Sequence, residues 1–428
     1  MSVQVLDGKG RHMPLDFTDD AAAEASTSGR ATILEKRLMT AFLRAMHGPS
    51  LAVELWGGER LYEGVGEPEI TLRIKTRRAL WGLLTNPDLN FGDRYSDGTV
   101  EVLGDLYRFI EIASAQRPQA VSDTSAFVRL QTVLGKGRPR RNTLSASKEN
   151  IHHHYDLSND FYSLWLDRDH MQYTCAYYPS ADMTIEQSQA AKLHHVCRKL
   201  QLREGDEVIE AGCGWGGLAR FMAREYGATV RAYNISHQQI LFARDKAREL
   251  GVDDRVEYVE DDYRNATGEC DVFVSVGMLE HVGTANYRSL GAVVDRCLRP
   301  EGRGLIHSIG RNRPRPMNRW IEKRIFPGAY PPTLKEMAAI FEPFNLSVLD
   351  VENLRLHYAL TLEHWLQRFE ENVAKVRDLF DERFVRAWRV YLTGSIAAFR
   401  LGDLQLFQVV FNRGESNEVP MTREHLYR

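Results

Sequence analysis

A glycine-rich stretch that contains one acidic residue is the part of this sequence best suited to bind a ligand. Residues 210–217 read EAGCGWGG and directly follow an apolar run typical of a β-strand. Glycine permits a tight turn and lets the backbone approach a ligand at the N-terminus of the next helix. Gly212, Gly214 and Gly217 fit the pattern GxGxxG. That pattern alone leaves open both a nicotinamide dinucleotide site and a glycine turn that binds no ligand.

Two features around this loop disfavour the nicotinamide interpretation. Glu210 lies two residues before the first glycine, where a carboxylate can meet the amino group of an amino-acid-like ligand. The next predicted strand ends in Tyr233 and Asn234, and so offers no Asp or Glu to a nicotinamide ribose. The order acid-x-G-x-G-x-G resembles the S-adenosylmethionine loop of class I methyltransferases.

Histidine and cysteine side chains give weaker signals. His152, His153 and His154 are consecutive, and neighbours on one segment cannot all face a single ion, so we predict no metal site. Five cysteines are an odd number without a CxxC pair, which favours a reduced cytoplasmic enzyme over a disulfide framework or a zinc ribbon. We assign Cys197, Cys270 and Cys297 to packing, and the residues alone leave Cys175 open as a nucleophile or a packed thiol.

Length and composition narrow the class of protein. The 428 residues correspond to two or three domains at roughly 100–200 residues each. Hydrophobic residues at 43% and charged residues at 26% exclude a disordered chain, and a net charge of −3 argues against a nucleic-acid partner. No apolar run reaches the ~18–20 residues of a membrane span, and the first residues lack the apolar core of a secretory signal.

The elements that must position the glycine loop read as alternating strands and helices. Strands are predicted at 207–211, 229–233, 256–259, 272–276 and 304–309, with helices at 218–225 and 238–250. This order predicts an α/β fold with a doubly wound, Rossmann-like parallel sheet. The last part of the chain is rich in helices, and we expect residues 404–411 to close the edge of the sheet.

The composition changes twice along the chain and suggests its domains. Residues 1–30 read as a loose leader, and 31–134 as a smaller α+β domain with a helix at 33–46, strands at 51–55 and 69–74, a helix at 76–84 and another near 101–113. A basic, Gly- and Pro-containing linker follows at 135–149, either a solvated connector or a contact for anionic phospholipid. The catalytic domain is expected over 150–428.

Several segments, taken together with the glycine loop, resemble the cyclopropane fatty acid synthase family, which includes the mycolic acid cyclopropane synthases. They extend over about 150–414 and read HYDLSNDFY (154–162), MQYTCAY (171–177), QAAKL (189–193), SVGMLEHVG (275–283), LIHSIG (305–310), IFPG (325–328) and LQLFQVVF (404–411). The N-terminal domain looks like the extra domain of the longer bacterial synthases, and residues 91–98 are its marker.

The resemblance implies transfer of a methyl group from S-adenosylmethionine to the cis double bond of an unsaturated acyl chain on a phospholipid, giving a cyclopropane. In this family bound bicarbonate is thought to remove a proton from the resulting carbocation. Its site is implied here for Cys175, Glu280, His307, Tyr358 and the backbone of Ile309. The same resemblance implies cofactor contacts at Tyr173, Thr174, Val208, Glu210, Gly212, Cys213, Gly214, Trp215, Gly216, Asn234, Ser236, Gln239, Asp262, Tyr263 and Arg264.

Some of these assignments carry a more specific expectation. Gln239 is expected to contact the ribose of the cofactor, and Asp262 and Tyr263 to flank its adenine. Asn234 stands where the family usually has Thr, so its contact with the cofactor stays open. The basic run at 311–324 is either a solvated face or a contact for lipid headgroup phosphate.

The resemblance also implies partners and a location. We expect a homodimer that associates with the inner face of the membrane from the cytoplasm, and helical C-terminal segments that line the lipid pocket. Alternatives are a methylene- or methyl-branched product, the latter with a separate reductase, and a small-molecule C-methyltransferase. From other classes, a nicotinamide oxidoreductase and a non-enzymatic lipid-binding module stay open.

Overall fold

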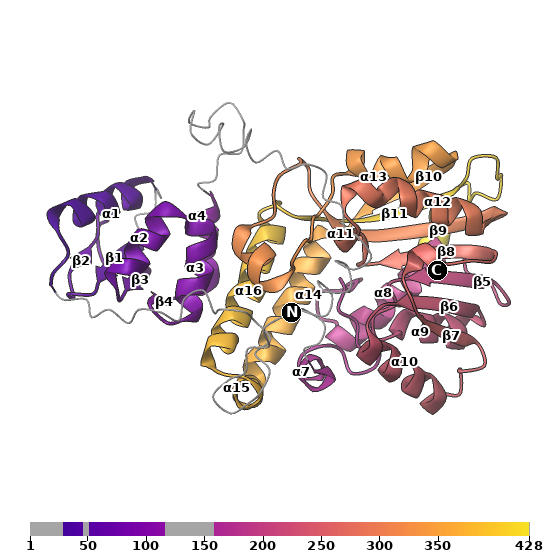
Figure 1. Cartoon of the computed structure of the whole chain (residues 1–428), viewed down its shortest axis with the longest axis horizontal. Helices are drawn as coiled ribbons and strands as arrows, with labels where there is room; N and C mark the ends of the chain where they lie inside the picture. The colour runs from indigo at the N-terminus through magenta and orange to yellow at the C-terminus, as the bar shows by residue number, and fades with distance from the viewer. Residues whose placement is uncertain (1–28, 46–50, 116–157, 428) are drawn as a thin grey trace, which may run out of the picture. The chain divides into compact units, whose positions relative to one another are not determined.

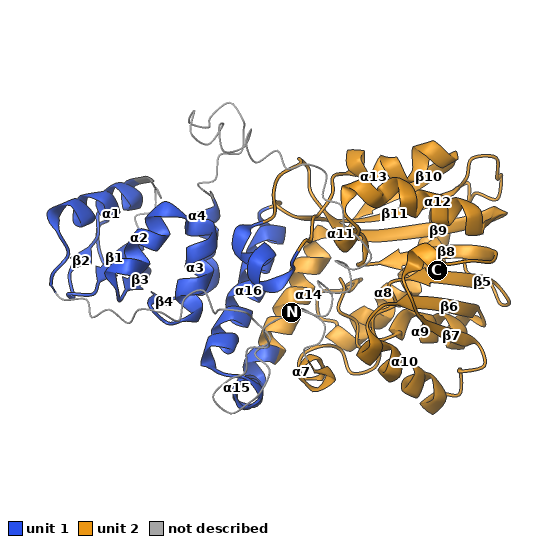
Figure 2. Ribbon diagram, viewed as in Figure 1, with its two compact units in different colours: residues 1–137, 318–327, 369–401 blue, residues 138–317, 328–368, 402–428 orange. Residues whose placement is uncertain are grey.

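The computed structural model describes residues 29–45, 51–115 and 158–427, and the chain forms two compact units (Figure 2). Unit 1 comprises residues 1–137, 318–327 and 369–401, and unit 2 comprises 138–317, 328–368 and 402–428. This division differs from the sequential one predicted, because two later segments belong to unit 1. The predicted linker at 135–149, most of the leader at 1–30, and His152, His153 and His154 lie outside the described residues.

Unit 1 contains a small sheet with the strand order β2-β1-β3-β4. Strands β1 and β3 are parallel and the other pairs are antiparallel. Its elements are α1 (Ile33–Ala45), β1 (Leu51–Leu55), β2 (Arg60–Leu61), β3 (Ile70–Ile74), α2 (Arg77–Thr85), α3 (Pro87–Ser96), β4 (Val100–Leu103), α4 (Leu106–Ala115), a π-helical turn at Ile321–Ile325, α15 (Val373–Leu379) and α16 (Glu382–Arg400).

Local sequence explains much of unit 1. In β3 the alternating residues Ile70, Leu72 and Ile74 are buried against the helices. Thr76 caps α2 by accepting a hydrogen bond from the backbone of Ala79. The helix predicted near 101–113 is in fact strand β4 followed by α4, because residues 100–103 pair with β3.

Buried polar contacts join the later segments of unit 1 to helix α3. The carboxylate of Asp93 accepts hydrogen bonds from the Trp320 indole at 3.0 Å and from the Arg324 guanidinium at 2.9 Å. Arg386 of α16 donates to the backbone carbonyls of Tyr95 and Val100. The segment 91–98, which marked this domain in the sequence, therefore holds the added segments in place.

Unit 2 is built on a seven-stranded sheet with the order β10-β11-β9-β8-β5-β6-β7 (Figure 1). Strands β9, β8, β5, β6 and β7 are parallel, whereas β11 and β10 join by antiparallel pairing. The strands are β5 (Glu207–Ala211), β6 (Thr229–Asn234), β7 (Val256–Glu260), β8 (Cys270–Val276), β9 (Leu298–Gly310), β10 (Leu346–Asn353) and β11 (Gln405–Arg413). The prediction that residues 404–411 close the sheet edge is wrong, because β11 lies between β9 and β10.

Helices cover both faces of this sheet, as a doubly wound fold requires. Neighbouring strand residues point to opposite faces: Leu305 packs in the cluster under α8, α9 and α10, and Ile306 packs in the cluster under α12 and α13. The predicted α/β fold is thus confirmed. The helices of unit 2 are α7 (Asn159–Ser163), α8 (Ile185–Lys199), α9 (Gly217–Tyr226), α10 (His237–Glu249), α11 (Leu279–Val282), α12 (Tyr287–Cys297), α13 (Leu334–Phe341) and α14 (Arg355–Glu371), the last of which ends in unit 1.

Short 3₁₀ turns complete the described chain at Tyr263–Asn265, Thr284–Asn286, Glu342–Phe344 and Glu424–Leu426. Within the residues that the structure describes, none of the helices combines the length and the apolar character needed to cross a membrane.

Candidate active site

The glycine loop lies at the carboxyl end of β5, between that strand and α9. Gly212, Gly214 and Gly216 have φ angles of 84°, 53° and 74°, a region that favours glycine. A side chain on Gly217 would place its Cβ 2.2 Å from the carbonyl oxygen of His170. The backbone amides of residues 212 and 213 donate to the Tyr233 carbonyl, which ties the loop to the end of β6. The loop therefore depends on glycine for both its turn and its close packing.

A cavity opens against this loop and collects most of the residues predicted for the cofactor. The predicted residues that line it are Tyr173, Thr174, Glu210, Gly212, Cys213, Gly214, Trp215, Asn234 and Gln239. Sequence reasoning missed the other lining residues, which are Met171, Gln172, Leu218, Val276, Gly277, Met278 and His281. Gln172, Met278 and His281 lie inside the motifs MQYTCAY and SVGMLEHVG, next to residues that were predicted for the site. Their place in these motifs could have indicated that they line the cavity.

The remaining cofactor predictions do not line the cavity. Val208 is in the hydrophobic core, Tyr263 packs in the cluster on the opposite face of the sheet, and Gly216 accepts a hydrogen bond from Tyr258 through its carbonyl. Asp262 is paired with Arg264 at 2.7 Å. Ser236 is buried at the start of α10.

Two buried polar atoms at the cavity lack a partner among the described residues. They are Oε2 of Glu210 and Nε2 of Gln239. Asn234 donates to the Gly214 carbonyl at 3.1 Å and to Oε1 of Gln239 at 2.8 Å, which orients the amide nitrogen of Gln239. Burial raises the pKa of the Glu210 carboxyl group to about 7. One acceptor and one donor are thus available to a ligand.

Aromatic side chains back one wall of the cavity. The ring of Tyr173 lies 5.4 Å from that of Tyr162, 5.2 Å from Trp165 and 5.3 Å from Trp365 between centroids. Tyr162 also contacts Trp215 of the glycine loop at 4.8 Å. These large apolar groups exclude water from the wall and present ring faces that can stabilise a cation.

The residues predicted for bicarbonate come together in a second cluster. The backbone amide of Ile309 donates to Oε1 of Glu280 at 2.5 Å, and His307 is two residues earlier on the same strand, β9. Glu280 lies on α11 between Met278 and His281, which both line the cavity. The cluster is therefore adjacent to the glycine-loop cavity.

Cys175 and Tyr358 reach this cluster through the start of α14. The Leu354 carbonyl accepts from the Cys175 thiol at 3.9 Å and from the Tyr358 amide at 3.1 Å. The Leu354 amide in turn donates to Leu406 of β11, and Leu406 is paired with Ile309 of β9. A chain of backbone hydrogen bonds and strand pairing thus connects Cys175 and Tyr358 to the strand that carries His307 and Ile309.

Burial controls the charge of this cluster. It raises the pKa of Glu280 to about 7, and Oε2 of Glu280 has no partner within the described part of the chain. It lowers the pKa of His307 well below its usual range and raises that of the Cys175 thiol. Cys175 is therefore held as a thiol, which disfavours its interpretation as a nucleophile.

Gln408 is a polar residue of this cluster that the sequence did not single out as functional. Its side chain is fully buried on β11, and Nε2 lies 3.1 Å from Nδ1 of His307. With the amide assigned as donor, the neutral imidazole carries its proton on Nε2. A glutamine inside the apolar run 404–411 was the signal that could have indicated it.

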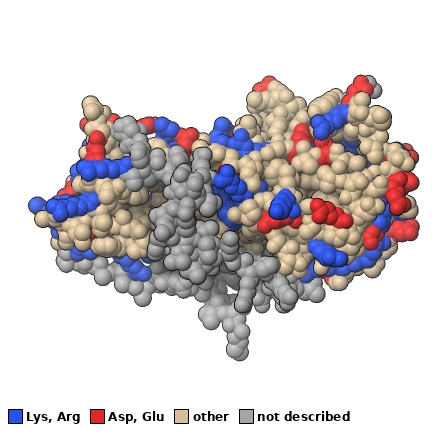
Figure 3. Space-filling model, turned by 90° about the horizontal axis from the view of Figure 1, so that it is seen from above, with Lys and Arg blue, Asp and Glu red and all other residues tan. Residues whose placement is uncertain are grey.

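The basic run at 311–324 is only partly exposed. Arg311 is 5% exposed and donates to the backbone carbonyls of Arg315 and Pro316, while Arg324 is 2% exposed. Arg311 and Arg324 are therefore part of the folded interior. Exposed side chains of the run are those of Arg313, Arg319 and Lys323. On the face that Figure 3 shows, basic and acidic side chains both occur across the described surface.

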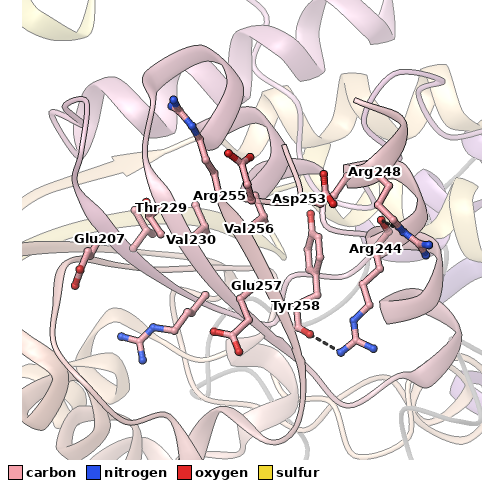
Figure 4. Close-up of a pocket in the computed structure, with 14 residues that line it drawn as sticks. Glu207, Thr229, Val230, Arg244, Arg248, Asp253, Arg255, Val256, Glu257 and Tyr258 are labelled. Carbon is pink, nitrogen blue, oxygen red and sulfur yellow. Dashed lines mark hydrogen bonds between the residues drawn. The ribbon is translucent and has the colours of Figure 1, made fainter. Parts of the chain in front are cut away.

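A larger concavity of about 630 Å³ lies at the other end of the sheet, where β5, β6 and β7 begin (Figure 4). Arg244, Arg248 and Arg255 line it together with Asp253 and Glu257, and Arg244 donates to the Tyr258 carbonyl. Ligands of open α/β sheets bind beyond the carboxyl ends of the strands. The glycine-loop cavity meets that condition and this concavity does not.

Comparisons with known proteins agree with this geometry. The family described as "Mycolic acid cyclopropane synthetase" matches residues 142–409, and a domain of unknown function matches residues 38–125. The chain is 36% identical over 398 residues to a "Probable fatty acid methyltransferase" of Pseudomonas putida, covering 90% of this chain and 98% of the relative. It is 38% identical over 365 residues to the "Cyclopropane-fatty-acyl-phospholipid synthase" of Escherichia coli K12, covering 84% and 92%.

A solved structure is similar to about three fifths of the chain. It is a mycolic acid cyclopropane synthase in complex with SAH and CTAB, 28% identical, with a TM-score of 0.59 over 62% of this chain and 98% of that one. The resemblance seen in the sequence motifs is confirmed. The chain belongs to the mycolic acid cyclopropane synthetase family and is an S-adenosylmethionine-dependent methyltransferase.

Proposed function

We propose that the chain transfers a methyl group from S-adenosylmethionine to the cis double bond of an unsaturated fatty acyl chain on a membrane phospholipid, and that the product is a cyclopropane. The observation that carries the proposal is the buried cluster of Glu280 and His307 next to the glycine-loop cavity. The acyl substrate is supported by the names of the two bacterial relatives.

The glycine-loop cavity suits S-adenosylmethionine, which when bound supplies an electrophilic methyl group on a positively charged sulfur. Glu210 offers the buried acceptor Oε2 to the amino group, and Gln239 offers the donor Nε2 to the ribose hydroxyls. A Cβ on Gly214 would have no neighbour within 4 Å among the described residues, so the backbone there is open to a ligand. These contacts would hold the methionine end and the ribose of the cofactor on either side of its sulfonium group.

Ring closure after methyl addition to an alkene requires that a proton be removed from the cationic acyl chain. The Glu280 cluster is suited to hold a small anion such as bicarbonate as the base. Protonated Glu280 and the Nε2 proton of His307 are donors for such an anion, and the resemblance to the family assigns Tyr358 and Cys175 to the same site. The Ile309 amide is bonded to Glu280, so its part is to orient that carboxyl group.

The lipid substrate would have to reach the cofactor from the membrane and be held there while it is positively charged. The substrate cation would form near Tyr173, and the aromatic wall behind it keeps water away and lowers the energy of the positive charge. Unit 1 would present the lipid or join two copies of the chain in a dimer. The enzyme would act from the cytoplasm on the inner face of the membrane.

The Pseudomonas putida relative, described only as a fatty acid methyltransferase, supports a second candidate product. If a 1,2-hydride shift first moves the positive charge to the methyl-bearing carbon, loss of a proton from the new methyl group gives a methylene branch, which a separate reductase would convert to a methyl branch. The position of the base relative to the acyl chain decides between ring and branch.

Mass spectrometry of membrane lipids tests the proposal. Cells expressing the chain are fed methyl-labelled methionine, and lipids are compared with those of cells expressing Glu280→Gln. We expect unsaturated phospholipid acyl chains to gain one labelled CH₂ group with the native chain and none with the variant. Fragmentation then distinguishes a ring from a branch.

Each outcome decides one part of the proposal. A labelled ring supports the cyclopropane, and a labelled branch replaces it with the second candidate. If no lipid gains label while the purified protein binds S-adenosylmethionine, the acyl substrate is wrong and a small-molecule C-methyltransferase takes its place. If the Glu280→Gln chain labels lipid at the native rate, the role of the Glu280 cluster is wrong.

A further inference from the structure

A buried lysine that has no part in the proposed chemistry lies behind the glycine-loop cavity. Lys192 of α8 is 1% exposed. Its Nζ donates to Oε1 of Gln172 at 2.5 Å and to Oγ1 of Thr174 at 2.8 Å. Within the described ranges of the chain, no carboxylate forms an ion pair with it. Burying an ammonium group costs free energy unless the group is hydrogen-bonded. The two acceptors offset that cost, so we ask what the buried lysine does for them.

Both acceptors belong to the wall of the cavity. Gln172 and Thr174 line it, and the backbone carbonyl of Thr174 accepts from Gln189, which is one turn before Lys192 on α8. Asp167 accepts from the amide of Gln172 at 2.6 Å, and Met171 between them has a φ of 51°. The wall segment is therefore an irregular backbone held by side-chain hydrogen bonds, many of them from α8.

The charge of Lys192 also acts on the acidic residue of the cavity. It favours the ionised form of Glu210 and so opposes the burial that favours the neutral form. The ionisable groups around Lys192 are Asp167, Cys175, Cys197, Glu210, His170 and His307, and Arg220 also acts on Glu210. Burial lowers the pKa of Lys192 itself to about 8.

We propose that Lys192 is a positioning residue of the cofactor site, which holds Gln172 and Thr174 in the cavity wall and places a positive charge in the surroundings of Glu210. Its Nζ donates to Gln172 and Thr174 of the wall segment, so its effect on the cofactor is exerted through these two residues. The proposal rests on the proposed placement of the cofactor in this cavity. It assigns a function to the motif QAAKL at 189–193, which the reaction itself leaves unexplained.

Direct binding of S-adenosylhomocysteine, measured by calorimetry from pH 6 to pH 9 without lipid, tests this role. We expect Lys192→Met to weaken binding by about tenfold or more, as loss of charged hydrogen bonds does. Its binding should also require a higher pH than that of the native chain, because Glu210 ionises later. Lys192→Gln keeps amide donors without the charge, and should recover affinity at high pH while retaining the shifted pH midpoint.

Lys199 provides a matched control. It lies seven residues along the same face of α8 and is 3% exposed, but it pairs with Glu352 at 2.6 Å and does not line the cavity. Lys199→Met should lower the melting temperature while leaving the affinity for S-adenosylhomocysteine and its pH midpoint unchanged.

The outcomes separate this inference from the proposed function. If the native chain fails to bind S-adenosylhomocysteine, the cofactor placement fails and the role of Lys192 with it. If the native chain binds and both Lys192 variants bind with native affinity and pH midpoint, only the role of Lys192 is overturned. If Lys199→Met weakens the binding of S-adenosylhomocysteine as much as Lys192→Met does, the role of Lys192 is likewise overturned. If Lys192→Met does not fold, Lys192→Gln decides by its pH midpoint.

Discussion

Glu280 is 7% exposed, and burial raises the pKa of its carboxyl group from 4.5 to about 7. Between these two pH values the folded chain keeps a proton that the unfolded chain has released. The free energy of unfolding therefore falls as the pH rises through this window, and is constant with respect to this group above it. A shift of this size corresponds to about 3 kcal/mol at most.

Replacing Glu280 by Gln should remove this pH dependence, because the amide keeps the acceptor for the Ile309 backbone and cannot ionise. Urea unfolding at pH 5 and pH 8 should show that the native chain loses up to about 3 kcal/mol relative to Glu280→Gln. If both proteins lost the same unfolding free energy between pH 5 and pH 8, the pKa of Glu280 would not be raised in the folded chain.

Glu352 provides a control of opposite sign for that measurement. Burial alone would raise its pKa, but the hydrogen bond from His195 and the charge of Lys199 lower it to about 2. Its ionised form contributes stability above about pH 4.5, which is lost as the pH falls toward 2. Glu352→Gln should thus be less stable than the native chain at pH 7, and the difference should disappear in acid.

Two motifs of the sequence pointed to Glu280 and His307 through the family resemblance, and the structure places both residues at one buried cluster; their chemical roles stay predictions. The contacts of Gln408 and Lys192 were not predicted, because they depend on which side chains face them in the fold. Gln408 meets His307 across 101 residues of chain, and no local pattern encodes that contact.

At the scale of elements, two glycines of the loop are needed for different reasons, although both belong to the same sequence pattern. One allows close packing and the other leaves room for a ligand. Gly217 is required for packing, since a Cβ there would lie 2.2 Å from the His170 carbonyl oxygen. Gly214 borders the cavity with open space around it and a φ of 53°, which costs a non-glycine residue about 1–2 kcal/mol. The two positions should therefore respond differently to one added methyl group.

We predict that Gly214→Ala folds and loses at least about tenfold in affinity for S-adenosylhomocysteine, whereas Gly217→Ala loses the folded loop and much of its thermal stability. Circular dichroism melting and calorimetric binding on both variants check this. Native affinity in Gly214→Ala would show that the ligand does not approach the loop at that residue.

The order of elements could be predicted from the sequence where strands and helices alternate. It could be predicted less well in the later part of the chain that contains β10 and β11. The parallel strands β5 to β8 follow from periodicity and overlap the ranges that the sequence predicted, whereas β9 begins at Leu298, before the predicted range of 304–309. β10 was missed, because only some of its residues are buried in its edge position. The placement of β11 between β9 and β10 depends on pairing over more than 90 residues of chain, so local pattern could not give it.

The largest departure from the sequence prediction is at the scale of the whole molecule. The sequence suggested successive domains, yet unit 1 takes in 318–327 and 369–401 from the region expected to be wholly catalytic. The segment 318–327 is joined to unit 1 by a buried ion pair, in which Asp93 is 3% exposed and Arg324 is 2% exposed, at 2.9 Å. Arg386 of α16 joins the segment 369–401 through hydrogen bonds to the carbonyls of Tyr95 and Val100. A basic run is usually solvated, so the sequence favoured a surface role for Arg324.

Removing the Asp93 carboxylate tests how far unit 1 depends on its late segments. Asp93→Ala leaves the Arg324 guanidinium buried without its charged partner and removes the acceptor of the Trp320 indole, which should cost about 3–5 kcal/mol of unfolding free energy. Glu63→Ala breaks the exposed pair with Arg44 in the same unit and should leave stability unchanged within error. Comparable urea midpoints for the two variants would mean that Arg324 finds water or another partner, and that the late segments associate with unit 1 through apolar packing alone.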